Sequence, residues 1–107
     1  MASDKEFLYY ILERLPDRAN VSYRPMMGEY LIYYNDRVVG GIYDNRFLVK
    51  QTDTSRKLFP DAALELPYEG GKEMIAIDDL EDQTLIYKLL NGMAAELPAP
   101  KKKIKDK

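Results

Sequence analysis

Hydrophobic positions at helical spacing mark both ends of the chain. Residues 4–15 carry a stripe of such positions, formed by Phe7, Leu8, Ile11, Leu12 and Leu15. This spacing predicts a first helix over 4–15 that ends before Pro16, with Ser3 and Glu6 as a capping box. Residues 85–97 repeat the helical spacing after an acidic run at 78–82, which suits the positive end of a helix dipole. The second stripe predicts the last helix.

Short segments rich in strand-forming residues lie between these helices. Strands are expected over residues 21–25, 30–34, 37–43 and 46–50, with a break or bulge at 26–28. The pairs at 35–36 and 44–45 consist of Asn and Asp, which tolerate the left-handed conformation of two-residue turns. A short helix over 52–59, a loop over 61–72 and a strand over 73–77 follow. We therefore expect a meander of hairpins, extended by one further strand.

One folding unit accounts for these elements, because 107 residues support a single core. The predicted class is α+β, a two-layer arrangement of a mostly antiparallel sheet with helices packed on one face. The expected order is α-β-β-β-β-α-β-α. The domain is expected to cover residues 1–97, and residues 98–107 are expected to form a disordered basic tail.

The two-residue turns also predict which side chains share a face of the sheet. Tyr34 should lie opposite Arg37, and counting back places Tyr30 opposite Gly41. The expected core face consists of Leu31, Tyr33, Val38, Gly40, Ile42, Phe47 and Val49. The opposite face then carries Tyr30, Ile32, Tyr34, Arg37, Val39, Gly41, Tyr43, Arg46, Leu48 and Lys50. Helix residues Phe7, Ile11, Leu15, Leu89 and Met93 are expected to cover the core face.

Composition excludes most catalytic chemistry. The chain has no cysteine and no histidine, so thiol nucleophiles, imidazole bases and the usual zinc ligands are absent. We expect no enzyme activity, no catalytic, cofactor or metal site, and no small-molecule substrate. No long apolar run and no signal-like segment occur, which predicts a cytoplasmic protein without membrane contact.

Nine tyrosines are the unusual feature of the composition. Tyr and Arg are enriched at protein interfaces, and they also stack on bases and contact phosphates. An interaction surface is therefore predicted on the outer sheet face and the segment before it, formed by Arg24, Met26, Met27, Tyr30, Tyr34, Arg37, Tyr43, Arg46 and Lys50. The alternative is a face that is solvated or covered by other parts of the chain. The expected occupant is a protein partner or a second copy of the chain.

Two stretches resemble the N-terminal domain of the TfoX/Sxy family. They are residues 23–34, which contain Arg-Pro-Met-Met-Gly before a strand, and residues 39–50, which contain Gly-Gly and end in Leu-Val-Lys. The resemblance covers about residues 4–97. It implies a bacterial cytoplasmic α+β domain, similar to type III secretion chaperones. Full-length members of this family resemble coactivators of competence genes that work with the cyclic-AMP receptor protein. Full-length members carry a second helical domain of the kind associated with DNA contact. No such domain is expected in this chain, so direct DNA binding is not expected.

The sequence thus predicts a non-enzymatic protein-interaction or regulatory domain that acts on transcription through a protein partner. The alternative is a nucleic-acid-binding module that uses the Tyr/Arg sheet face and the lysine tail. Within the family-like motif, Arg24 is expected to make a polar contact, and Gly28 to adopt a conformation unfavourable to other residues.

Overall fold

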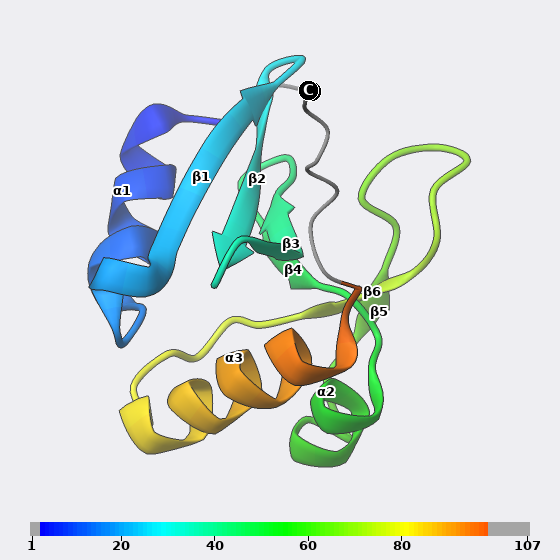
Figure 1. Cartoon of the computed structure of the whole chain (residues 1–107). Helices are drawn as coiled ribbons and strands as arrows, with labels where there is room; N and C mark the ends of the chain where they lie inside the picture. Colours follow the sequence, from blue (N-terminus) through cyan, green and yellow to red (C-terminus); the bar gives the residue numbers. More distant parts are fainter. Residues whose placement is uncertain (1–2, 99–107) are drawn as a thin grey trace, which may run out of the picture.

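The computed structural model describes residues 3–98 of the chain. These residues form a six-stranded antiparallel sheet that is covered on one face by helices (Figure 1). The helices are α1 (Lys5–Arg14), α2 (Asp53–Leu58) and α3 (Gln83–Glu96), with a 3-10 turn, η1, at Arg18–Asn20. The strands are β1 (Val21–Met26), β2 (Glu29–Tyr34), β3 (Arg37–Ile42), β4 (Phe47–Val49), β5 (Leu64–Glu65) and β6 (Met74–Ala76). Their order in the sheet is β1-β2-β3-β4-β6-β5. The predicted class and order are confirmed, and β5 is an addition within the expected loop at 61–72.

Tight turns join the strands of the meander. Asn35 and Asp36 between β2 and β3, and Asp44 and Asn45 between β3 and β4, all have φ between 51° and 67°. Two left-handed residues in succession match the twist of a hairpin, and Asn and Asp accept this conformation readily. Gly28 in the β1–β2 turn has φ 87°, which confirms the unusual conformation predicted there.

A β-bulge in β3 changes the predicted faces of the sheet. Tyr34 pairs with Arg37 as expected, but Tyr30 pairs with Ile42 and not with Gly41, because Val39 is an extra residue without a partner on β2. An inserted residue exchanges the two faces on one side of the bulge. The face assignment was therefore wrong for β2 and the start of β3, and correct from Gly40 onward.

The core contains some residues that were predicted to lie in it and others that were predicted to lie on the opposite face. Ile42, Phe47 and Val49 are buried against α1 and α3, as predicted. The expected helix residues Ile11, Leu15, Leu89 and Met93 are buried with them, and Phe7 is half-buried. Leu31 and Val38 are only half-buried, and Leu31 packs in a smaller cluster on the opposite face. Ile32, Tyr34 and Val39 take their places in the main core, and each has an exposed fraction of 0%.

The helix starts are stabilised by different means. The expected capping box at Ser3 is not formed: the N-cap is Asp4, which makes no side-chain cap. The Ser3 hydroxyl instead donates to the Glu29 carboxylate and accepts the Asn45 backbone N–H, so the segment before α1 is tied to two hairpin turns. At α2, Thr52 is the N-cap and completes a capping box with Ser55.

The start of α3 is capped by the last acid of the run at 78–82. The Asp82 carboxylate accepts the Leu85 backbone N–H at 3.1 Å. At the other end, α3 packs closely on α2, because a Cβ at Gly92 would lie 2.5 Å from the Thr54 side chain. The predicted tail at 98–107 lies outside the described residues apart from Pro98.

Candidate functional site

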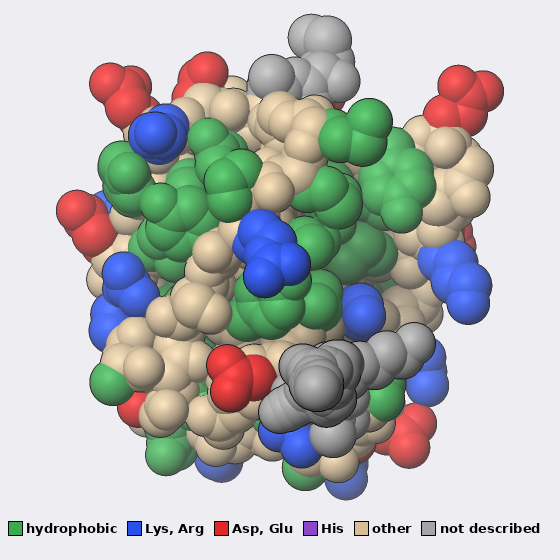
Figure 2. All heavy atoms as spheres, turned by 45° about the horizontal axis from the view of Figure 1, so that its top comes forward, with side chains coloured by type: hydrophobic (Ala, Val, Ile, Leu, Met, Phe, Trp, Pro, Cys, Tyr) green, Lys and Arg blue, Asp and Glu red, His purple; other side chains and the backbone are tan. Residues whose placement is uncertain are grey.

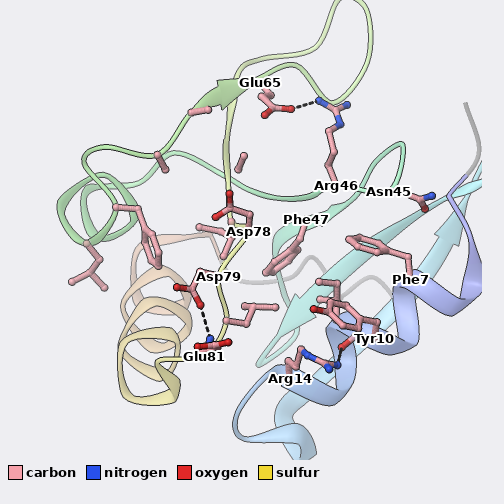
Figure 3. Close-up of a pocket in the computed structure, with 18 of the residues that line it drawn as sticks. Phe7, Tyr10, Arg14, Asn45, Arg46, Phe47, Glu65, Asp78, Asp79 and Glu81 are labelled. Carbon is pink, nitrogen blue, oxygen red and sulfur yellow. Dashed lines mark hydrogen bonds and ion pairs between the residues drawn. The ribbon is translucent and has the colours of Figure 1, made fainter.

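A groove of about 1090 Å³ lies between α1 and the segments on either side of β5 and β6 (Figure 3). One wall is α1, the floor is formed by residues of β4 and β6, and the opposite wall by residues 58–63 and 78–81. The Gln83 amide donates to the Arg14 carbonyl at 2.7 Å and to the Leu80 carbonyl at 2.8 Å. The bond to Arg14 ties the start of α3 to the end of α1, and Gln83 itself lines the groove.

The α1 wall is an aromatic ladder. Phe7, Tyr10 and Arg14 follow at helical spacing and therefore project from one face of the helix. The Phe7 and Tyr10 rings are stacked with centroids 6.0 Å apart, and the Arg14 guanidinium lies 3.6 Å from the Tyr10 centroid. Arg14 also donates to the Tyr10 carbonyl at 2.9 Å. Tyr10 remains 49% exposed, so this wall offers accessible aromatic surface.

The floor of the groove is formed by apolar side chains that are packed into the core. Phe47, Ile11 and Ile77 line the groove and are almost fully buried. Leu58 and Phe59 on the opposite wall are half-buried, as is Phe7. Figure 3 shows the Phe7, Tyr10 and Phe47 rings pointing into the same space. A ligand would therefore contact mainly the walls, since the floor presents little free surface.

Acidic side chains outnumber basic ones along the groove. Six carboxylates and two guanidinium groups line it, a formal charge of −4. Arg46 pairs with Glu65 at 2.7 Å, and Arg14 lies 3.8 Å from Glu13. Within residues 3–98 the four remaining carboxylates take part in no ion pair; they are Asp61, Asp78, Asp79 and Glu81. All four belong to the wall opposite α1.

These carboxylates do not form a compact cluster. Among the residues that the structure describes, no three acidic side chains come close enough to hold a metal ion. The Asp79 carboxylate accepts the Glu81 backbone N–H at 3.0 Å, which fixes the turn before α3. The wall thus presents separate negative charges above an apolar floor.

The tyrosines that were expected on the outer face are largely inside the protein. Tyr34 is fully buried in the main core, where its hydroxyl donates to the Asp17 carboxylate. Burial, and then this hydrogen bond, raises the pKa of Tyr34 to about 12. The same bond, with one from Asn20, lowers the pKa of Asp17. Tyr30 is half-buried against the main core, so neither tyrosine forms the predicted outer surface.

Tyr43 and Arg46 are neighbours at the β3–β4 turn, but both side chains are engaged in contacts within the protein. Tyr43 is 5% exposed and packs edge-on against Tyr68, with ring centroids 6.0 Å apart. Its burial is the main cause that raises the pKa of Tyr43. Arg46 donates to the carbonyls of Tyr43 and Leu66 and to a carboxylate, so it joins the β3–β4 turn to the chain after β5. The predicted single Tyr/Arg surface is therefore wrong.

Two basic residues of that prediction lie at the margins. Arg37 is half-buried and donates to the Asn35 carbonyl at 3.2 Å, whereas Lys50 is exposed. On the face that includes the top of Figure 1, hydrophobic side chains gather with Lys and Arg among them and acids mostly at the edge (Figure 2). This distribution contrasts with the acidic wall of the groove.

The family-like motif lies at the β1–β2 hairpin. Met27 is 97% exposed and has φ 52°, while Met26 is half-buried in the smaller cluster. Arg24 is exposed, and the described chain shows no polar contact of its side chain, so that prediction is not met. The Gly28 carbonyl accepts the Ser3 backbone N–H at 2.9 Å, which joins the hairpin to the start of α1.

One curated protein is similar to nearly the whole chain. It is described as "Uncharacterized 12.7 kDa protein in trpE 5'region" from Spirochaeta aurantia, and it is 38% identical over 102 residues. The match covers 94% of this chain and 89% of that protein. The chain belongs to the family of this spirochaete protein. No family model and no solved structure matches the sequence.

The similarity to the spirochaete protein extends over the segments that build the groove, since it covers nearly all of both chains. Of the nine residues predicted to form the interaction surface, only Arg46 lines the groove. Only one acid of the run at 78–82 caps the helix start as expected: Asp82 caps α3, whereas Asp78, Asp79 and Glu81 line the groove. In the described part of the chain, no helix is both long and apolar enough to cross a membrane.

Proposed function

We propose that this chain is a non-enzymatic protein-interaction domain that binds a partner in the groove beside α1. The observation that carries the proposal is the size and lining of this groove. Its volume of about 1090 Å³ is at the large end of the roughly 300–1,000 Å³ range of ligand pockets, and aromatic side chains on both walls remain partly exposed. Aromatic residues and Arg are enriched where proteins bind each other, and such anchors carry most of the binding energy.

The chemistry of the lining supports binding in preference to catalysis. The groove offers carboxylates, guanidinium groups and one phenol, and the sequence has no histidine or cysteine to act as base or nucleophile near neutral pH. Arg14 is held over the Tyr10 ring and Arg46 is held by Glu65. Both guanidinium groups are therefore held in place by contacts within the protein, and they help to define the walls of the groove.

The resemblance to TfoX/Sxy N-terminal domains supports a regulatory role for this binding. In that view the partner is a protein of bacterial gene regulation, and the domain acts on transcription through it in the cytoplasm. The nucleic-acid alternative has less support, because Tyr30 and Tyr34 do not form an exposed stacking surface and the groove is acidic.

Site-specific photo-crosslinking in native cells tests this proposal. A photoreactive amino acid at Leu58, on the groove wall, is compared with the same residue at Lys88, an exposed position of α3 outside the groove. We expect a discrete protein adduct at position 58 that is absent at position 88. The adduct should disappear when Phe59→Asp places a charge on the apolar wall, while circular dichroism shows an intact fold.

Three results would contradict the proposal. Equal adducts from both positions would show that the groove is not the binding site. An adduct that nuclease digestion removes would show a nucleic-acid ligand, as in the alternative hypothesis. Absence of any groove adduct, in cells where the chain is abundant, would also refute a partner at this site.

A further inference from the structure

The two walls of the groove differ in charge, which restricts what can bind between them. The α1 wall is aromatic and ends in Arg14, whereas the opposite wall carries the four carboxylates that have no ion pair in the described chain. A ligand that is apolar alone would leave those carboxylates facing a dehydrated interface, which is unfavourable. The ligand must therefore bring positive charge to one side only.

We infer that the groove binds a basic amphipathic helix of a partner protein, in which Lys or Arg side chains border an apolar stripe. The inference rests on the proposed function and specifies the partner. An apolar stripe with i, i+3, i+4 and i+7 anchors is the usual way in which a helix occupies a hydrophobic groove. Here the stripe would lie between Phe7 and Tyr10 on one side and Leu58 and Phe59 on the other.

The arrangement of charges sets the orientation of that helix. The Tyr10 ring already carries the Arg14 guanidinium at 3.6 Å, so a cation of the partner cannot use the same ring face. The partner's cations are expected at the opposite wall, near Asp61, Asp78 and Asp79, which Figure 3 shows in part. The helix therefore carries its basic side chains along one border of the apolar stripe, with small or acidic residues facing Arg14.

Acidic partners do not fit this surface. Nucleic acid, or a peptide with Asp and Glu beside its apolar stripe, would meet the formal charge of −4 along the groove. Like charges across an interface oppose binding. The groove should therefore bind a basic amphipathic helix more tightly than an acidic helix with the same apolar residues.

Titration of the full chain with three synthetic helical peptides tests the inference. The first has a leucine stripe with lysines along one border, the second replaces each lysine by glutamate, and the third keeps the lysines but replaces the leucines by serine. Fluorescence anisotropy gives the Kd, and amide chemical shifts show where each peptide binds. We expect binding of the first peptide only, shift changes confined to groove residues, and an affinity that falls as salt is raised.

Two double variants test the role of the wall. Asp78→Asn with Asp79→Asn should weaken binding of the leucine–lysine peptide by about three- to tenfold, as expected for partly exposed charge pairs. Glu69→Gln with Glu73→Gln makes the same change of net charge outside the groove and should change the Kd by less than about twofold. Equal effects of the two double variants would refute a specific acidic wall.

Other outcomes separate the inference from the proposed function. Equal binding of the glutamate peptide, or of the leucine-free peptide, would overturn the basic amphipathic helix. A specific photo-crosslink at position 58 to a partner that contributes no basic segment would also overturn it, while the proposed function would stand. Loss of the crosslink at position 58, with the peptides still bound in the groove, would count against the proposed function alone.

Discussion

Tyr34→Phe is the most informative single substitution, because it removes one hydroxyl from the core and leaves the ring in place. The ring is fully buried, and its hydroxyl donates to the Asp17 carboxylate. Hydrogen bonds to charged groups contribute about 1.5–3 kcal/mol. Asp17 is half-buried and keeps the Asn20 amide at 2.9 Å, so water can replace part of the loss. We expect the free energy of unfolding at pH 7 to fall by about 1.5–2 kcal/mol.

The same substitution changes how stability responds to alkaline pH. An unfolded tyrosine ionises near pH 10, whereas the pKa of Tyr34 in the folded protein is about 12. Between these values the unfolded chain loses a proton that the folded chain keeps, so stability falls as pH rises through this window. The full effect of such a shift is about 2.7 kcal/mol. Tyr34→Phe lacks this step, and the wild-type advantage should therefore shrink as the pH rises from 10 toward 12.

Urea unfolding followed by circular dichroism, from pH 7 to 11, measures both effects. Tyr33→Phe is the matched control, because Tyr33 is half-buried on the opposite face and its hydroxyl has no hydrogen bond in the described chain. A difference between wild type and Tyr34→Phe that stays constant over this pH range would refute the reasoning. Unchanged stability of Tyr34→Phe at pH 7 would refute the hydrogen bond itself.

Four further predictions concern the core, two glycines and acid pH. Phe47→Ala should lower the free energy of urea unfolding by about 3–5 kcal/mol through the cavity it leaves. Gly40→Ala should cost at least about 3 kcal/mol in the same assay, because its Cβ would lie 2.1 Å from a backbone oxygen of β4. Gly70→Ala, with no atom within 4 Å but φ +86°, should cost only about 1–2 kcal/mol. Hydrogen bonds from Thr54 lower the pKa of Glu96 in the folded protein, so the wild type should lose stability as the pH falls through that pKa. Urea unfolding at a series of pH values should show this loss in the wild type and not in Glu96→Gln.

The elements of the fold were predictable from local patterns, but one register was not. Helical spacing and the Asn/Asp turns are short-range signals, and they placed the helices and hairpins correctly. The bulge at Val39 left no such signal, because Val38 and Val39 are both apolar and Gly40 and Gly41 have no side chain to assign to a face. A single extra residue then moved Tyr30 and Tyr34 from the predicted surface to the core side.

The groove was harder to predict than the fold, because it brings together residues from Phe7 to Gln83. Only the α1 wall had a local signal, since Phe7, Tyr10 and Arg14 share one helix face. The opposite wall depends on how β6 returns beside β4, and no local pattern specifies that pairing. The acids at 78 and 79 could equally have served the helix start.

The tight hairpins also have a consequence for the order of folding. Strands β1 to β4 pair with sequence neighbours through two-residue turns, and such hairpins form in about 1–10 μs. Strand β6 must instead reach β4 across α2 and β5, and a contact of this range is slower because more chain entropy is lost first. The meander is therefore expected to form early, and the arrival of β6 and α3 to be the late event. Because that event builds the acidic wall, a chain still folding has the aromatic ladder but not the groove, and it gains its binding site only with the last step.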